Sequence, residues 1–271
     1  MAVCHVPGKE KGRSAVKTFD TRAATPLRVR EAEEIRRSAE DAKKVDLEGF
    51  EIDRYLRTHR DTAYSLEYAF WLLGEVRGKL VVDLGCGAGQ NSAVLAAMGA
   101  RVIGLDLSPH LLEIARKRVR GADFREASAL ETGIPPGSVD VVFGIAILHH
   151  LPLDQARDEV FRILRPGGIG IFHEPVQNSR GMAFLRKCIP IQTGEISAFE
   201  RPFRDRELDD FCAPFELAAQ RRFRLPFVKL FKIMLPRLTG LACRTDRLLL
   251  KIGSLEHFAT VRVFKLVKPN Q

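Results

Sequence analysis

The chain has 271 residues, of which 45% are hydrophobic and 28% charged, and its formal net charge is +9. A chain of this length can bury a large hydrophobic core, so its stability does not require disulfides or metal ions. Its five cysteines stand far apart, with no Cys-x-x-Cys pair and no Cys/His pair at metal-ligand spacing. These totals argue against a disulfide framework and a zinc site, and they favour a reducing cytoplasm.

Residues 1–26 are polar and basic and lack apolar periodicity, so we expect a disordered tail there. They contain no apolar core of a signal peptide. No uninterrupted apolar run in the chain approaches the length needed to span a membrane. We therefore expect a cytoplasmic protein that at most rests on a membrane surface.

Residues 27–78 are predicted to form helices. Mixed charges at helical spacing around Val29, Ile35 and Val45 indicate a weakly amphipathic helix. The following stretch gathers all three tyrosines and the only tryptophan just before a glycine-rich motif. Aromatic side chains at this density indicate either packing or a helical lid over a pocket, and we predict an N-terminal helical lid.

From Lys79 onward, short β-branched runs alternate with helical stretches. The predicted strands are 79–85, 101–106, 122–126, 139–145 and 168–174, and the predicted helices between them are 90–98, 109–119 and 153–164. Alternation of this kind, with strands apolar throughout, predicts an α/β fold with a doubly wound parallel sheet covered on both faces. The segment 79–175 is thus the predicted core.

The segment 176–271 is predicted to be a substrate cap together with the last strands of the sheet. Two further strands are expected at 215–225 and 257–267, and the helical stretch between them is broken by Pro236. This segment carries the whole charge surplus: from Pro175 to the end there are 18 Lys and Arg against 9 Asp and Glu, and 25 of each before it. Such asymmetry indicates either an anionic partner or a solvated basic face.

The stretch "DLGCGAGQ" follows the first predicted strand. Its glycines are Gly85, Gly87 and Gly89, and the next residue is Gln90. A dinucleotide-binding turn requires Gly-x-Gly-x-x-Gly, and a phosphate-binding loop requires Lys followed by Ser or Thr. Both signatures are absent, which argues against a dinucleotide and against a phosphate loop. The turn alone leaves the ligand open among a dinucleotide, a nucleotide phosphate and a ligand without phosphate.

Asp106 ends the second predicted strand and therefore shares the crevice at the carboxyl ends of the strands. A carboxylate there can accept both hydroxyls of a ribose. Ser128 and Ala129 follow the third strand, where a hydroxyl and a backbone N–H can meet a nucleobase edge. The pattern predicts a nucleoside ligand.

Four stretches resemble the successive signature motifs of class I S-adenosylmethionine-dependent methyltransferases. They are "VVDLGCGAGQ", "VIGLDLSPHLLEIAR", "SALETGIPPGSVDVVFGIAILHHL" and "EVFRILRPGGIGIFHEP". They run in order from Leu80 to Pro175. The resemblance implies a seven-stranded, mostly parallel, Rossmann-like sheet whose last strand is antiparallel. It also implies S-adenosyl-L-methionine bound across the first four strands, S-adenosyl-L-homocysteine as product, and no metal ion.

The resemblance also assigns the cofactor contacts. They are Asp83, Gly85, Cys86, Gly87, Gly89 and Gln90 around the methionine part, Asp106 at the ribose, Leu107, Ser128 and Ala129 at the adenine, and Gly144 and Ile145 at the end of the fourth strand. Family members often carry aspartate where this chain has Ser128. A serine hydroxyl can still bond the adenine amine.

Three residues are candidates for the catalytic step. A sulfonium already activates the methyl group, so the protein's main task is alignment, and a base is needed only if the acceptor loses a proton. His149 and His150 follow the fourth strand and border the methyl group in this fold, with one of the two expected to be structural. Glu174 ends the fifth strand at the expected pocket rim, as a base or as a binder of the acceptor.

The acceptor is predicted to be a small, largely apolar molecule such as a lipid-like, isoprenoid, quinone or polyketide compound. The Glu-Pro at 174–175 and the later "ERPF" resemble a bacterial small-molecule subgroup. Phenylalanines are abundant in the predicted cap: Phe184, Phe199, Phe203, Phe211, Phe215, Phe223, Phe227 and Phe231. They indicate an apolar pocket, unless they form only the core of the cap.

The charge surplus of the segment from Pro175 to the end of the chain indicates two other possible partners, nucleic acid and an anionic membrane. "RRFRLPFVKLFK" interleaves cations with aromatic residues, as RNA-modifying methyltransferases could require, but "GIAI" stands where enzymes acting on base amines carry Asn/Asp-Pro-Pro-aromatic. Nucleic acid is therefore the alternative partner. In "FVKLFKIMLPRL", Lys229 and Lys232 recur at helical spacing among apolar residues, which suits a helix lying on an anionic bilayer. A buried helix flanked by lysines is the competing interpretation.

Overall fold

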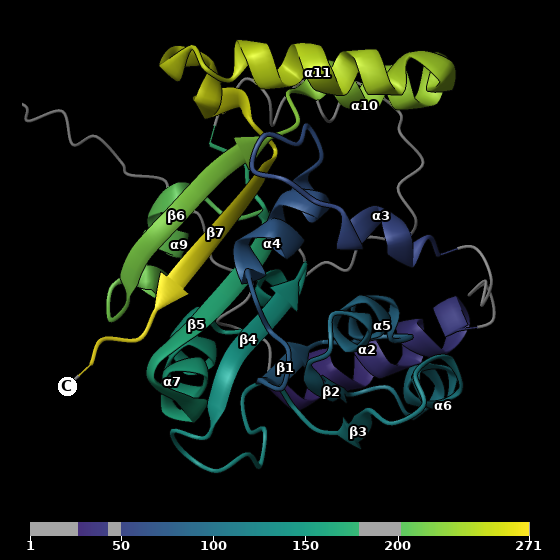
Figure 1. Ribbon diagram of the computed structural model, residues 1–271, viewed down its shortest axis with the longest axis vertical. Coiled ribbons are helices and arrows are strands. Elements are labelled where there is room, and N and C mark those ends of the chain that lie inside the picture. The colour runs from purple at the N-terminus through teal and green to yellow at the C-terminus, as the bar shows by residue number, and fades with distance from the viewer. Residues whose placement is uncertain (1–26, 43–49, 179–201, 271) are drawn as a thin grey trace, which may run out of the picture.

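The computed structural model describes residues 27–42, 50–178 and 202–270 (Figure 1). They form one seven-stranded sheet with the order β3-β2-β1-β4-β5-β7-β6. The strands are β1 (Leu80–Leu84), β2 (Arg101–Asp106), β3 (Asp123–Glu126), β4 (Val139–Ile145), β5 (Leu164–Pro175), β6 (Glu216–Phe223) and β7 (Val261–Val267). The first five are parallel, and β7 runs antiparallel to both of its neighbours. The predicted mostly parallel sheet with an antiparallel last strand is confirmed.

Helices lie on both faces of the sheet (Figure 1). They are α2 (Leu27–Ala42), α3 (Ile52–Leu56), α4 (Ser65–Leu73), α5 (Gln90–Ala97), α6 (Pro109–Arg118), α7 (Leu153–Ile163), α9 (Asp205–Cys212), α10 (Pro226–Met234) and α11 (Thr239–Leu249). Three 3-10 turns complete the described elements: η1 (Leu148–His150), η2 (Pro236–Leu238) and η3 (Gly253–Phe258). Within the described ranges, no helix is long and apolar enough to cross a bilayer. The predicted tail at 1–26 lies outside the described residues.

Alternate side chains of the central strands pack into two separate hydrophobic cores, one on each face of the sheet. Val82 and Phe172 pack on the side of α7 and α9, whereas Val81 and Ile171 pack on the side of α4 and α5. Because successive side chains of a strand point to opposite faces, strands buried on both faces are apolar throughout, as the sequence shows here. The division of the chain into four segments stays a prediction.

The phenylalanines of the C-terminal segment belong mainly to these cores. Phe203, Phe211, Phe215 and Phe223 are each at most 8% exposed. Phe211 packs edge-on against Phe172, with ring centroids 5.3 Å apart. These four rings therefore do not support an apolar acceptor pocket, because they fill the protein's own interior. Phe227 and Phe231 are half-buried on α10. Phe184 and Phe199 lie outside the described residues.

His173 holds α4 on the sheet. It follows Phe172 and precedes Glu174 on β5, so its side chain points to the face opposite theirs, where its Nε2 lies 2.9 Å from the Ser65 hydroxyl at the start of α4. Burial, assisted by the positive charge of Arg224, lowers the pKa of His173 to about 4. The imidazole is thus a neutral packing group of the fold.

The buried imidazole predicts acid sensitivity. Between its ordinary pKa of 6.5 and its folded-state value of about 4, the unfolded chain binds a proton that the folded chain does not, so stability falls as the pH falls through this window. We expect His173→Gln to lose less unfolding free energy than the wild type between these pH values, measured by urea unfolding at several pH values. The exposed His257→Gln should follow the wild type; parallel curves for His173→Gln and wild type would contradict the assignment.

Candidate functional site

In the glycine turn after β1, Gly85 and Gly89 are closely packed, whereas the space next to Gly87 is open. Gly85, Gly87 and Gly89 have φ angles of 71°, 51° and 78°, a region that residues with a Cβ rarely adopt. A Cβ on Gly85 would lie 2.7 Å from Ile147 Cδ1, and one on Gly89 would lie 2.9 Å from Ala115 Cβ. A Cβ on Gly87 would meet nothing within 4 Å. The backbone at Gly87 is therefore open to close approach.

Asp83, on the strand before this turn, has one carboxylate oxygen without a hydrogen-bond partner. Its carboxylate is fully buried, and Oδ2 accepts a hydrogen bond from the Ser92 hydroxyl at 2.5 Å. Oδ1 is buried without a hydrogen-bond partner. Burial raises the pKa of Asp83 to about 7. A buried acceptor without a partner is costly, so Oδ1 is suited to a donor brought by a ligand or water.

Asp106 ties the turn to the end of β2. Its Oδ2 accepts from the Gly87 N–H at 2.8 Å, and its Oδ1 accepts from the Ser108 N–H at 2.9 Å. Burial raises the pKa of this carboxyl group. Because a carboxylate offers about four acceptor positions, capacity remains for the two hydroxyls of a ribose.

Four further residues of the predicted cofactor site are buried or half-buried. Cys86 is buried, and burial raises the pKa of its thiol far above the ordinary range. Gln90 is the half-buried first residue of α5, and Leu107 is half-buried after β2. Ala129 is buried within the core on the α7 side.

Helix α2 lies against α6 and reaches the same edge of the sheet (Figure 1). The Ser128 hydroxyl donates to Oε1 of Glu31 on this helix at 2.9 Å. One turn later, Oε2 of Glu34 lies 3.3 Å from Nδ1 of His150. Sequence reasoning missed both glutamates; their i, i+3 spacing on one helix face was the available signal.

Glu174 is fully buried, so it does not stand at the pocket rim as predicted. Its Oε1 accepts the backbone N–H groups of Ile147 and Leu148 at 2.9 and 2.8 Å. Its Oε2 lies 3.0 Å from Nδ1 of His149. The carboxylate thus fixes both the turn after β4 and one histidine ring.

The two histidines of η1 differ in their partners. His149 pairs with the buried Glu174, whereas His150 pairs with Glu34 of α2, and their ring centroids are 4.1 Å apart. The hydrogen bond to His150 lowers the pKa of Glu34. Because a carboxylate accepts, the contact with Oε2 of Glu174 favours the tautomer of His149 whose proton is on Nδ1 and whose lone pair is on Nε2.

Gly144 and Ile145 end β4 beside the glycine turn. Gly144 is buried, and a Cβ on it would lie 2.8 Å from the Phe172 ring. Ile145 is half-buried and is followed by Ala146, whose φ of 56° turns the chain into η1. The predicted cofactor residues and both histidines are therefore gathered at one edge of the sheet, at the carboxyl ends of its parallel strands.

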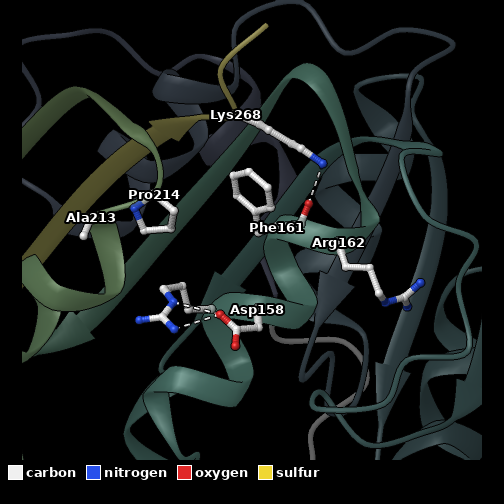
Figure 2. A pocket seen from close by; sticks show the side chains of 7 residues that line it. Asp158, Phe161, Arg162, Ala213, Pro214 and Lys268 are labelled. Carbon is white, nitrogen blue, oxygen red and sulfur yellow. Dashed lines mark hydrogen bonds and ion pairs between the residues drawn. The ribbon is translucent and has the colours of Figure 1, made fainter. Parts of the chain in front are cut away.

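A separate surface hollow of about 740 Å³ lies at the opposite edge (Figure 2). Its Lys268 donates to the carbonyl oxygens of Phe161 and Leu164, at the end of α7 and the start of β5. The side chains that line it come from α7 and from the loops after α9 and β7. None of the predicted site residues lines this hollow.

The chain is similar to known methyltransferases. A family model described as a methyltransferase domain matches residues 82–172. A probable S-adenosylmethionine-dependent methyltransferase of Mycolicibacterium smegmatis is 34% identical over 125 residues. The matched part covers 45% of this chain and 48%, about half, of the relative's length. A ubiquinone biosynthesis O-methyltransferase of Shewanella pealeana is 30% identical over 181 residues, which cover 57% of this chain and 72% of that relative.

A solved structure shares the fold. The geranyl diphosphate C-methyltransferase of Streptomyces coelicolor aligns with a TM-score of 0.53 at 18% identity, covering 74% of this chain and 79% of its own. This likeness shows the fold, in agreement with the strand order. The relative that is 30% identical over 72% of its own length shows the family. The chain belongs to the class I S-adenosylmethionine-dependent methyltransferases.

Proposed function

We propose that this protein methylates a hydroxyl group of a small lipophilic molecule. S-adenosyl-L-methionine supplies a methyl group on a sulfonium sulfur, which keeps the bonding electrons when the methyl group leaves. The observation that carries the proposal is the His149–Glu174 pair at the same sheet edge as the glycine turn and Asp106. The S. pealeana relative, named as a ubiquinone biosynthesis O-methyltransferase, supports the acceptor class.

The residues present fit the cofactor. Asp106 would accept the ribose hydroxyls, and the open backbone at Gly87 would lie against the methionine part, above the partnerless Oδ1 of Asp83. Leu107 would cover one face of the adenine. Ser128, whose hydroxyl is held by Glu31, and Ala129 would meet the edge of the base.

His149 is the proposed general base. Its Nε2 would take the proton of the acceptor hydroxyl as that oxygen bonds to the methyl carbon. Glu174 is a positioning residue, because its buried carboxylate fixes the ring and stabilises the imidazolium that forms. His150 pairs with Glu34 and would lie between the His149 ring and α2, as a packing group of the site.

The RNA alternative loses part of the feature that motivated it, because two of the cations in that stretch have partners within the protein. The guanidinium of Arg221 lies over the rings of Phe223 and Tyr68, 4.4 and 5.2 Å from their centroids, and donates to the carbonyl oxygens of Arg60 and Thr62. Its neighbour Arg222 pairs with Asp205 at 2.6 Å. These cations are used in packing, so a small-molecule acceptor remains the proposal.

The first test concerns the cofactor. We expect Asp106→Ala to weaken S-adenosyl-L-methionine binding by about 10- to 100-fold, because charge-assisted hydrogen bonds to the ribose are lost. Isothermal titration calorimetry measures the dissociation constant. The matched control is Asp123→Ala at the exposed start of β3, and circular dichroism checks the fold. Unchanged affinity in Asp106→Ala would show that the ribose is placed wrongly.

The second test concerns the base and the acceptor. Transfer of labelled methyl groups to a panel of catechols and phenols with prenyl tails should give an extractable product, and label found only in macromolecules would overturn the proposal. His149→Ala should lower kcat by about 10²- to 10⁴-fold without weakening cofactor binding, because only proton removal is lost.

Glu174 should separate a positioning role from a merely structural one. Glu174→Gln keeps the shape of the side chain but removes its charge, so we expect a lower kcat and a shifted acid limb of the pH–rate profile. The exposed His257→Ala serves as the matched control and should keep the wild-type profile. An unshifted profile in Glu174→Gln would contradict the positioning role.

A further inference from the structure

The exposed apolar side chains of this protein gather on one segment. Among the described residues, thirteen large hydrophobic side chains are exposed, and nine of them lie between residues 230 and 258. They are Leu230, Ile233, Met234, Leu235, Leu238, Leu241, Leu248, Ile252 and Phe258. Contiguous exposed apolar surface marks an interaction site rather than ordinary surface. We call α10, η2, α11 and η3, residues 226–258, the apolar hairpin.

Both helices of the hairpin are apolar on two sides. On α10, Val228 is buried and Phe227 packs edge-on against Phe231, whereas Leu230, Ile233 and Met234 are exposed at i, i+3 and i+4. The inner side therefore already has partners, and the outer side presents a second apolar stripe.

The outer side of α11 continues this surface. Leu241 and Leu248 are seven residues apart, which places them on one face of α11. Ile252 is exposed shortly after the helix ends. From the last turn of α10 to the end of η2, every residue of the stretch 232–238, "KIMLPRL", is exposed. The hairpin thus ends in an apolar tip that carries two cations.

The charge that the hairpin presents to solvent is mainly positive. It contains six Lys and Arg but only two acidic residues, Asp246 and Glu256. Asp246 is buried and accepts the backbone N–H groups of Arg224 and Leu225, and Glu256 faces Arg222 of β6 at 3.6 Å. Asp246 is therefore withdrawn from solvent, whereas the side chain of Glu256 is 50% exposed. Lys232, Arg237 and Arg244 are exposed as well, so the exposed charge of the hairpin is mainly positive.

The hairpin stands at the same edge of the sheet as the functional site. Phe223 at the carboxyl end of β6 is in register with Val261, which is also in register with Pro175 at the carboxyl end of β5. Helix α10 begins three residues after Phe223. Figure 1 shows α10 and α11 as a layer beyond the tip of the β6 arrow.

We propose that the apolar hairpin docks this protein onto an anionic membrane. The outer apolar side chains would enter the boundary between headgroups and acyl chains, with the exposed cations on lipid phosphates. Charge decides between a bilayer and a second copy of the chain, because two hairpins of net positive charge would repel each other in a symmetric contact. The proposal does not depend on the proposed function, since it concerns only binding.

Vesicle flotation tests the proposal with the full chain. We expect the wild type to float with phosphatidylcholine vesicles that contain about one third phosphatidylglycerol, and to stay at the bottom with pure phosphatidylcholine. Binding to the anionic vesicles should weaken as the salt concentration rises. Circular dichroism and thermal unfolding of every variant show whether the fold is kept.

Two variants separate the apolar and the charged contributions. The double variant Ile233→Ser/Met234→Ser should lose most of its vesicle binding, whereas Leu217→Ser, an exposed apolar residue of β6, should bind like the wild type. The double variant Lys232→Glu/Arg237→Glu should bind more than tenfold more weakly, because each cation near the surface contributes about fivefold. The exposed pair Arg120→Glu/Arg206→Glu is its matched control.

Three outcomes would overturn the proposal. In the first, the wild type stays at the bottom of the gradient with anionic vesicles. In the second, both hairpin variants float as well as the wild type. In the third, analytical ultracentrifugation shows a dimer that Ile233→Ser/Met234→Ser dissolves while vesicles bind nothing, which would assign the surface to a second copy of the chain.

Discussion

The buried carboxylate of Glu174 is the contact on which the geometry of the site depends. It accepts two backbone N–H groups of the turn after β4 and faces Nδ1 of His149, so one side chain sets both the path of the chain and the direction of a ring. A buried carboxylate needs such donors, because burial without them is costly. The shape of η1 and the proposed position of the base therefore follow from one interaction.

A second carboxylate organises the neighbouring part of the edge. Asp106 joins the glycine turn to the end of β2, and α2 adds Glu31 and Glu34 from a distant part of the sequence. Acidic side chains thus surround the place proposed for a ligand that carries a positively charged sulfonium. The described residues hold no group of three or more metal-ligating side chains.

The proposed acceptor site and the apolar hairpin share one edge of the sheet because of its topology. The carboxyl ends of β4, β5 and β6 point the same way, since β7 is antiparallel to both β5 and β6. Asp246 links α11 to the backbone just before α10, which holds the hairpin in place on the end of β6. A protein docked through the hairpin would present its catalytic edge toward the side from which a lipophilic molecule arrives.

The sequence by itself determined the sheet and its seven strands, because the strand and helix periods are local features readable within a few residues. It also determined the family, through the resemblance of four motifs that follow one another in order. Only the tertiary structure decided that Glu174 is buried, that Phe211 and Arg221 are used in packing, and which side of α10 faces solvent. These outcomes depend on partners far away in the chain, such as His149 for Glu174 and Tyr68 for Arg221. A helix that is apolar on two sides carries no local signal that tells the buried side from the exposed one.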